Sequence, residues 1–108
     1  MSKNIVLDKA GTGKKPKLTD TVTVHYRAVW VNSTEFDSSY ERGVPVSVQV
    51  NGVIPGWTEA LQLMEVGAKW QLFVPSNLAY GEQGREGLIG PNMTLIFELE
   101  LLKIQEKK

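Results

Sequence analysis

The chain of 108 residues contains no cysteine and only one histidine. Without cysteine it can form no disulfide, no thiol nucleophile and no thiolate-ligated metal site. The single histidine, His25, falls on the polar face of a predicted strand, where we expect it to be exposed to solvent. It has no evident serine partner and no second histidine, which argues against a hydrolytic triad and against a metal site. We therefore expect a function that needs neither a metal nor a cofactor.

The chain also lacks an excess of charge of either sign, because 12 basic residues balance 12 acidic ones. Proteins that bind nucleic acid by neutralising phosphates are usually basic, so we expect no nucleic-acid partner. No apolar run approaches the roughly 20 residues of a membrane-spanning helix, and the first residues contain no apolar signal core. The sequence does not fix the compartment: as written it is that of a cytoplasmic protein, and we expect no membrane partner. A periplasmic or secreted location is expected instead if a longer natural N-terminus was removed.

One stretch has a convincing helical pattern, and it begins at Pro55. Proline suits the first helical position because its φ angle is fixed and its missing N–H would be unpaired there. From Trp57 onward the apolar residues recur on one helical face: Ala60, Leu61 and Met64. Gly67 is expected to end the helix in the left-handed conformation. A helix this short is unstable alone in water, so it must pack on the rest of the domain.

Most other segments alternate between apolar and polar residues, as half-buried strands do. The expected strands are 5–7, 21–31, 35–39, 46–50, 69–74 and 93–104. We expect a loop over 40–45, one tight helical turn over 76–81, and a glycine-rich surface loop over 81–90. Antiparallel strands around one short helix predict a single domain over 1–108 of the α+β class.

Aromatic side chains come from separate predicted elements: Tyr26, Phe36, Trp57, Tyr80 and Phe97. The plain alternative is that all of them belong to the core. However, Trp57 and Tyr80 each carry a polar group that needs a partner when buried. Asp37, beside Phe36, would be costly in a dry core, and Arg42 is close enough in sequence to pair with it. An apolar pocket with a few polar groups at its rim accounts for these residues.

At these residues the sequence resembles the FKBP-type peptidyl-prolyl cis-trans isomerases, the tacrolimus-binding immunophilins. The motifs that carry the resemblance are Thr23-Val-His-Tyr26, Phe36-Asp-Ser-Ser39, Val53-Ile-Pro-Gly-Trp57, Leu78-Ala-Tyr-Gly81, Thr94-Leu-Ile-Phe97 and Glu100-Leu-Leu102. The likeness covers 9–104, and the stretch 53–64 is most similar to the bacterial macrophage infectivity potentiator branch. It implies a twisted antiparallel sheet of five to six strands wrapped around one short helix, with a pocket between them.

The resemblance also implies the residues of the site. The implied catalytic residues are Asp37, Tyr80, Trp57 and Phe97. The implied substrate or inhibitor contacts are Tyr26, Phe36, Arg42, Val46, Val53, Ile54, Leu88 and Ile89. Val46 stands where an aromatic wall residue is common in the family, so we expect that side of the pocket to be more open.

The implied activity is rotation about the peptide bond that precedes proline. Amide resonance opposes this rotation with a barrier of about 18–20 kcal/mol. A twisted amide has lost much of its dipole, so an apolar pocket should disfavour it less than the planar amide. In this assignment the floor is Trp57, the walls are Tyr26, Phe36 and Phe97, and the rim is Val53 and Ile54. The Ile54 N–H would hold a substrate carbonyl, Tyr80 would donate a hydroxyl hydrogen bond, and Asp37 would position or polarise the substrate.

The implied partners are proline-containing polypeptides and the macrolides tacrolimus and rapamycin, and we expect a monomer. Two other functions compete with the isomerase. The first is a non-catalytic proline-peptide-binding or chaperone module. The intact set of site residues favours catalysis over this alternative. The second is an oligonucleotide-binding barrel, which the balanced charge disfavours.

Overall fold

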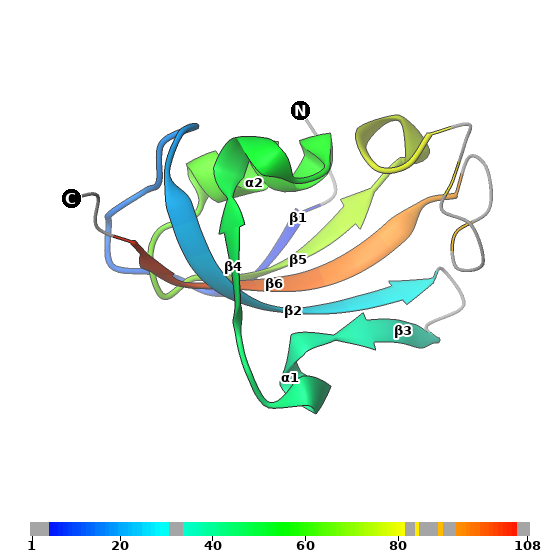
Figure 1. Ribbon diagram of the computed structural model, residues 1–108, viewed down its shortest axis with the longest axis horizontal. Coiled ribbons are helices and arrows are strands. Elements are labelled where there is room, and N and C mark those ends of the chain that lie inside the picture. Colours follow the sequence, from blue (N-terminus) through cyan, green and yellow to red (C-terminus); the bar gives the residue numbers. More distant parts are fainter. Residues whose placement is uncertain (1–4, 31–33, 82–83, 85–88, 90–92, 106–108) are drawn as a thin grey trace.

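The computed structural model describes residues 5–30, 34–81, 84, 89 and 93–105. Its main feature is a six-stranded antiparallel sheet that curves around one helix (Figure 1). The strands are β1 (Ile5–Lys9), β2 (Thr21–Trp30), β3 (Glu35–Ser38), β4 (Val46–Gln49), β5 (Lys69–Val74) and β6 (Leu95–Ile104). The helices are α1 (Ser39–Arg42), α2 (Pro55–Leu63) and two single 3₁₀ turns, Val50–Gly52 and Ser76–Leu78. The expected α+β class is therefore confirmed.

The sheet has the order β1-β5-β6-β2-β3, and β4 also pairs with β2. One edge of β2 is thus shared by two short strands. β4 pairs with the first part of β2 as far as Val24, opposite Val46, and β3 pairs from Arg27 onward, opposite Ser38. On this edge, the two residues between Val24 and Arg27 lie between the two stretches of pairing.

Helix α2 begins as the sequence predicts, with Pro55 in its first turn. It lies over the concave side of the sheet (Figure 1). The buried face of α2 consists of Gly56, Trp57, Ala60 and Leu61. It joins a core to which the sheet contributes Val22, Val24, Leu72, Val74, Leu95, Phe97, Leu99 and Leu101. The alternation predicted for the last strand is confirmed, because its apolar face is buried along its length.

The predicted end of α2 is wrong. The helix ends at Leu63, and Gly67 has a left-handed φ of 92° in a later turn. The residues in between are held by the segment that follows β1. The Val66 carbonyl accepts a hydrogen bond from the Thr12 N–H, and the Val66 N–H donates to the Lys14 carbonyl. These contacts join segments that are far apart in the sequence, so no local sequence pattern predicts them.

The segment predicted as a loop over 40–45 is also different, because it begins inside the short helix α1. The Ser38 side chain caps this helix by accepting a hydrogen bond from the Glu41 N–H, at 3.3 Å. Gly43 ends it in the left-handed conformation, with φ of 75°. Both signals are present in the sequence, but a helix of four residues is too short for apolar periodicity to reveal.

The remaining boundaries agree with the sequence analysis to within a few residues. The strand expected over 46–50 ends at Gln49, since Val50 opens a 3₁₀ turn. The tight turn expected after Pro75 is the 3₁₀ turn Ser76–Leu78. Neither α1 nor α2, the α-helices of the described part of the chain, is long and apolar enough to cross a membrane.

Candidate functional site

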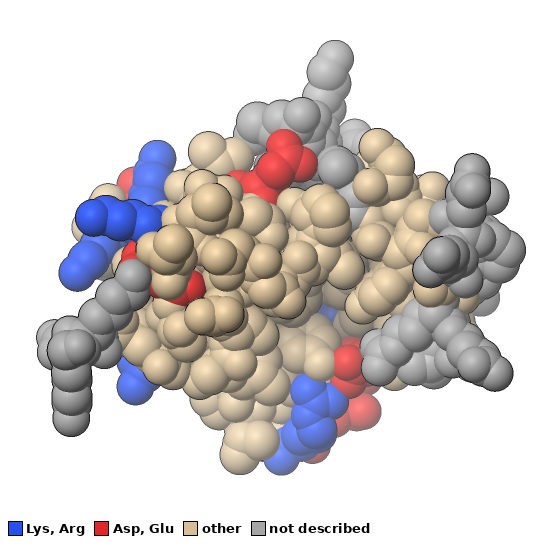
Figure 2. Space-filling model, turned by 45° about the horizontal axis from the view of Figure 1, so that its top comes forward, with Lys and Arg blue, Asp and Glu red and all other residues tan. Residues whose placement is uncertain are grey.

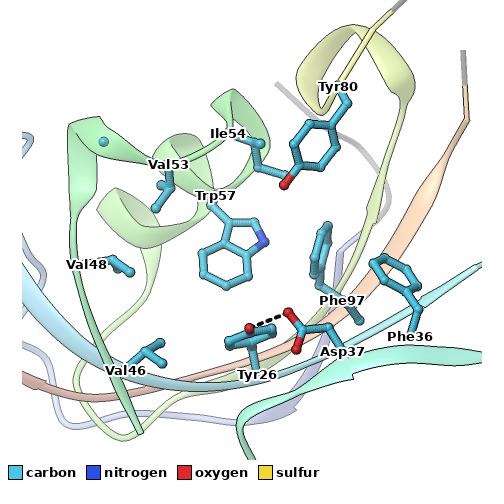
Figure 3. A pocket seen from close by; sticks show the side chains of 12 residues that line it. Tyr26, Phe36, Asp37, Val46, Val48, Val53, Ile54, Trp57, Tyr80 and Phe97 are labelled. Atoms are coloured by element: carbon cyan, nitrogen blue, oxygen red, sulfur yellow. Dashed lines mark hydrogen bonds between the residues drawn. The ribbon is translucent and has the colours of Figure 1, made fainter. Parts of the chain in front are cut away.

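A cavity of about 590 Å³ lies between α2 and the concave face of the sheet (Figure 3). Its wall is formed by Tyr26, Ala28, Phe36, Asp37, Val46, Val48, Gly52, Val53, Ile54, Trp57, Tyr80 and Phe97. Most of these side chains are apolar, and Asp37 is the one acidic group among them. Figure 2 shows that uncharged residues form the centre of this side of the molecule, with charged groups mostly toward its edges.

Trp57 is the largest side chain of the cavity and only 7% exposed. Its ring meets two others edge to face: Tyr26, with centroids 5.3 Å apart and planes at 69°, and Phe97, at 5.3 Å and 83°. This arrangement places positive ring edges against negative ring faces, which aromatic pairs prefer. The buried indole Nε1 has no hydrogen-bond partner within the described residues. Packing against two rings therefore fixes the orientation of the indole, and Trp57 lines a cavity as the sequence predicts.

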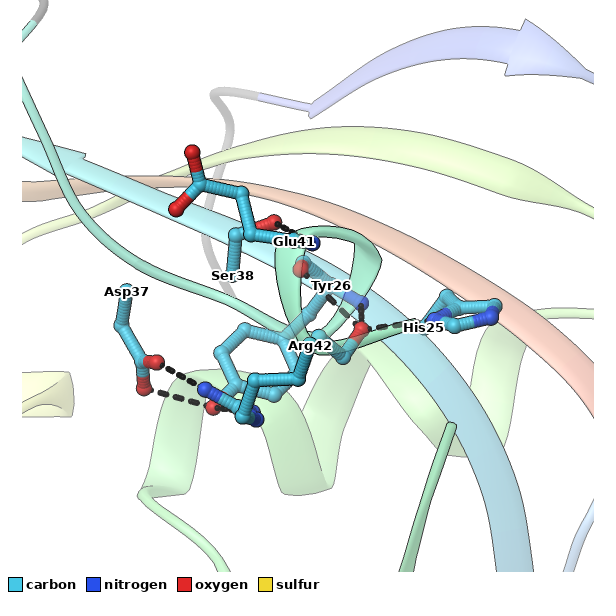
Figure 4. A network of polar contacts seen from close by, with 7 residues as sticks. His25, Tyr26, Asp37, Ser38, Glu41 and Arg42 are labelled. Atoms are coloured by element: carbon cyan, nitrogen blue, oxygen red, sulfur yellow. Dashed lines mark hydrogen bonds and ion pairs between the residues drawn. The ribbon is translucent and has the colours of Figure 1, made fainter. Parts of the chain in front are cut away.

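A polar cluster stands at the edge of the cavity and joins Tyr26, Asp37 and Arg42 (Figure 4). The Tyr26 hydroxyl donates to Asp37 Oδ2 at 2.5 Å, and Arg42 Nη1 donates to Asp37 Oδ1 at 2.6 Å. Arg42 Nη2 also donates to the Tyr26 hydroxyl, at 2.9 Å, and the guanidinium carbon lies 5.6 Å from the centre of the Tyr26 ring. Each residue thus contacts the other two, and the predicted pairing of Arg42 with Asp37 is confirmed.

These contacts displace the pKa values of the cluster in opposite directions. Burial alone raises the pKa of Asp37, but the hydrogen bonds from Tyr26 and Arg42 outweigh it, so this pKa lies below its ordinary value. Burial raises the pKa of Tyr26, and its hydrogen bond to the Asp37 carboxylate raises it further. At neutral pH the cluster therefore consists of a carboxylate, a neutral phenol and a guanidinium. An ionised Asp37 with a lowered pKa is a poor general base.

The prediction of an exposed His25 is wrong. The imidazole is half-buried and stacks on the Tyr40 ring, with centroids 4.6 Å apart. Its Nδ1 lies 2.8 Å from the hydroxyl oxygen of Ser39. The alternation of the strand correctly places His25 on the face opposite the cavity. It could not show that α1 folds back over that face.

All the residues predicted for the floor, walls and rim line the cavity. The predicted residues Asp37, Tyr80 and Val46 line it as well. Figure 3 shows the Tyr80 hydroxyl pointing into the space beside Ile54. Sequence reasoning missed Ala28, Val48 and Gly52. Ala28 and Val48 each lie two residues from a predicted wall residue on the same strand, so strand periodicity could have found both.

Two predicted contacts, Arg42 and Ile89, are not part of this wall, and a third cannot be placed. Arg42 is bonded to two lining residues, but its own side chain is 45% exposed at the edge. Ile89 is 5% exposed and belongs to the hydrophobic core, so its contact with substrate stays a prediction. Leu88 lies outside the described residues. Among the residues that the structure describes, no three His, Asp or Glu side chains come close enough to hold a metal ion.

The fold and the site together define one class of domain: a curved antiparallel sheet around one helix, with an aromatic cavity between them. The chain matches the family model described as FKBP-type peptidyl-prolyl cis-trans isomerase over residues 12–102, and it belongs to this family. The family and fold predicted from the sequence are therefore confirmed.

Several relatives are similar to this chain over most of its length. The chain is 53% identical over 97 residues to the outer membrane protein MIP of Legionella longbeachae, covering 90% of the chain and 42% of that protein. It is 55% identical over 94 residues to the FKBP-type 22 kDa peptidyl-prolyl cis-trans isomerase of Escherichia coli, covering 87% and 46%. The chain thus spans less than half the length of these relatives.

Solved structures of similar proteins share the fold of this chain. The crystal structure of FkpA from Escherichia coli superposes with a TM-score of 0.88 at 46% identity, covering 94% of this chain and 47% of that one. A peptidyl-prolyl cis-trans isomerase from Pseudomonas syringae pv. tomato gives a TM-score of 0.87 at 39% identity, covering 94% and 74%. At this identity the likeness extends beyond the fold to the sequence that forms it.

Proposed function

We propose that this chain is a single isomerase domain that catalyses cis–trans rotation of X–Pro peptide bonds without a covalent intermediate. The observation that carries the proposal is the cavity itself. Its floor and walls are aromatic and aliphatic, and its polar cluster sits at one edge. A volume of about 590 Å³ suits a proline ring with its neighbouring residues, within the roughly 300–1,000 Å³ of small-molecule sites.

The proposed mechanism uses the apolar character of the cavity. Uncatalysed exchange takes tens to hundreds of seconds. Exchange within about a millisecond needs roughly 10⁴- to 10⁵-fold acceleration, or about 6–7 kcal/mol. The planar amide loses more solvation than the twisted amide when it enters an apolar site, so the barrier between them falls. No proton transfer or bond cleavage is required, which agrees with an Asp37 whose pKa is lowered.

The lining residues have distinct proposed roles. Trp57 supports the proline ring from below, and Tyr26, Phe36 and Phe97 enclose it. The Ile54 N–H, at the start of α2, holds the carbonyl on the far side of the proline. Tyr80 donates a hydrogen bond to the rotating amide carbonyl. Asp37, whose negative charge is balanced by the Arg42 guanidinium, positions the substrate at the cavity edge.

The proposed partners are proline-containing polypeptides, bound by a monomer. Tacrolimus and rapamycin are proposed to occupy the same cavity and to quench Trp57 fluorescence, since Trp57 lies on its floor. No change of fluorescence at saturating macrolide would contradict this part of the proposal.

The test is catalysed exchange of a short proline peptide, followed by NMR exchange spectroscopy beside a proline-limited refolding assay. We expect both rates to rise with enzyme concentration, and we expect Asp37→Val to lower both. A matched control is Glu98→Val, which removes a carboxylate from β6, on the other side of β2 and on the opposite face of the sheet. Peptide binding without faster exchange would instead favour a non-catalytic proline-peptide-binding or chaperone module.

A further inference from the structure

Helix α1 carries Arg42, but it would not be stable in isolation. It contains four residues, Ser39–Arg42, and a single helical turn is far below the length that is stable in water. The cap at Ser38 and the left-handed Gly43 define where it begins and ends. They do not fix where it lies relative to the sheet, so contacts with the sheet must do so.

The first of these contacts is made by Ser39, whose side chain is fully buried. Its hydroxyl oxygen accepts a hydrogen bond from the Tyr26 N–H at 2.7 Å and lies 3.2 Å from the Tyr26 carbonyl oxygen, to which it donates. Tyr26 sits between the parts of β2 that pair with β3 and with β4. The Ser39 side chain therefore replaces a neighbouring strand for the one residue of β2 that also belongs to the polar cluster.

The second contact is made by Tyr40, on the side of the sheet away from the cavity. Its ring stacks on His25 of β2, and its hydroxyl donates to Glu100 Oε1 of β6 at 2.7 Å. The Lys69 ammonium of β5 lies 5.5 Å from the ring centre. Burial and the Glu100 carboxylate raise the pKa of Tyr40, so its hydroxyl remains a donor. One side chain thus ties α1 to three strands.

Arg42 completes the arrangement from the last position of α1. Its side chain is long, 45% exposed, and would lose its contacts with Asp37 and Tyr26 if α1 moved. Figure 4 shows it reaching past the Tyr26 ring toward Asp37. We propose that Ser39 and Tyr40 are positioning residues, which hold α1 against the sheet so that Arg42 keeps Asp37 and Tyr26 in place at the cavity. Their effect on turnover rests on the proposed isomerase function.

The experiment is a double-mutant cycle between Tyr40 and Arg42, with kcat/KM measured on a proline peptide. Tyr40→Ala removes the stacking, the hydrogen bond and the cation contact, and we expect about a tenfold loss. Tyr40→Phe retains the ring, and we expect it to keep most of the activity, within about two- to fivefold of the parent. In an Arg42→Ala background, Tyr40→Ala should cost nothing further, because the residue through which it acts is gone.

A merely structural role would give a different result, namely equal losses with and without Arg42. The control is Gln105→Ala, which removes a side chain that bonds Ser47 at 2.7 Å and Thr23 at 3.4 Å at the far end of the same edge of β2. We expect this control to keep the parent kcat/KM. Full activity of Tyr40→Ala, or additive losses in the cycle, would overturn the proposal.

A second readout does not depend on catalysis. The pKa of the Asp37 carboxyl, followed by its ¹³C shift in a pH titration, should rise toward the ordinary 3.8 in Tyr40→Ala and stay low in Gln105→Ala. The same titration of Ser39→Ala, if that variant folds, should show the same rise. If the parent protein does not accelerate proline exchange, the proposed function fails. The titration still shows whether Tyr40 holds α1 against the sheet. An unchanged Asp37 pKa in Tyr40→Ala would refute the positioning role.

Discussion

Tyr26 and Arg27 are neighbours on β2, yet they belong to two polar networks on opposite faces of the sheet. Arg27 bonds Glu35 at 2.5 Å and Glu98 at 3.4 Å, and Lys69 approaches Glu98 at 3.8 Å. The shortest of these distances equals the 2.5 Å between Tyr26 and Asp37 in the cluster at the cavity edge. What differs is the surroundings, because the Arg27 network lies over the outer face of the sheet, while the Tyr26 cluster borders an aromatic cavity.

The comparison shows that ion-pair geometry does not by itself indicate function. Exposed pairs contribute little to stability, since water and salt screen them. A carboxylate that also holds a phenol at an apolar cavity is a stronger candidate for a functional group. Matched substitutions on the two faces of β2 can therefore test whether the environment, and not the pairing, sets the importance of each network.

The largest contrast is expected from removing the cavity floor. Trp57→Ala should destabilise the fold by about 3–5 kcal/mol, as truncation of a large buried aromatic does, and should abolish most activity. Arg27→Ala on the outer face should leave the free energy of unfolding nearly unchanged, because water and salt screen an exposed ion pair. Denaturant melts and peptide-exchange assays on both variants provide the measurement. Equal losses of stability would show that the outer network contributes as much as the core.

A smaller contrast is expected between two carboxylates on the two strands that flank β2, Asp37 on β3 and Glu98 on β6. Asp37→Val leaves the Tyr26 hydroxyl and Arg42 without their common partner, and hydrogen bonds to charged groups contribute about 1.5–3 kcal/mol, or roughly ten- to a hundredfold in rate. We expect a loss in this range in kcat/KM, without the complete inactivity that removal of a nucleophile causes. Glu98→Val should leave the rate within about twofold of the parent. A similar loss in both would contradict a special role for the cavity edge.

Tyr80→Phe should have a still smaller effect. It removes one hydroxyl from the cavity and keeps the ring, so about 0.5–1.5 kcal/mol, or two- to tenfold in rate, is expected. Stability should change little. A complete loss of activity in a fully folded Tyr80→Phe would show that one proton-bearing group carries the chemistry, and the mechanism by desolvation would have to be abandoned.

The smallest effect is expected from pH across the neutral range. The lowered pKa of Asp37 contributes stability that is fully present above its ordinary value of 3.8 and is lost as pH falls through the lowered value. The raised pKa of Tyr26 contributes stability that is present below 10.0 and is lost only as pH rises through the raised value. Both kcat/KM and the free energy of unfolding should therefore be nearly flat between about pH 5 and pH 9 as far as this cluster is concerned. A step near neutral pH that disappears in Asp37→Val would contradict this assignment.

The sequence predicts the cavity better than it predicts the edge of the cavity. Trp57 could be placed because Pro55 starts the helix and the apolar positions that follow share one face. Strand periodicity supports Tyr26 in the same way, and it could also have found Ala28 and Val48, which the prediction left out. Those signals are local, and they are strong because burial of one face repeats with the period of the element.

The parts that were mispredicted depend on contacts between distant segments. His25 is covered because Ser39 and Tyr40 fold back over it, and α2 ends before Gly67 because Val66 bonds to the segment near Thr12. The Ser39 side chain takes the place of a paired strand beside Tyr26, and no periodic pattern in the sequence predicts such a contact. The resemblance to a family supplied the residues of the site, and only the structure showed which of them share hydrogen bonds.

The gap on the edge of β2 has a consequence for local opening. Most of β2 is paired with neighbouring strands, and the exchange of an amide bonded within these pairs requires the sheet to separate. The amide of Tyr26 is instead held by the Ser39 hydroxyl at 2.7 Å, on a helix of four residues. Small units open at lower free energy than the core. Deuterium uptake at this single amide therefore measures how often α1 leaves the sheet, while the uptake of its neighbours measures how often the whole domain unfolds.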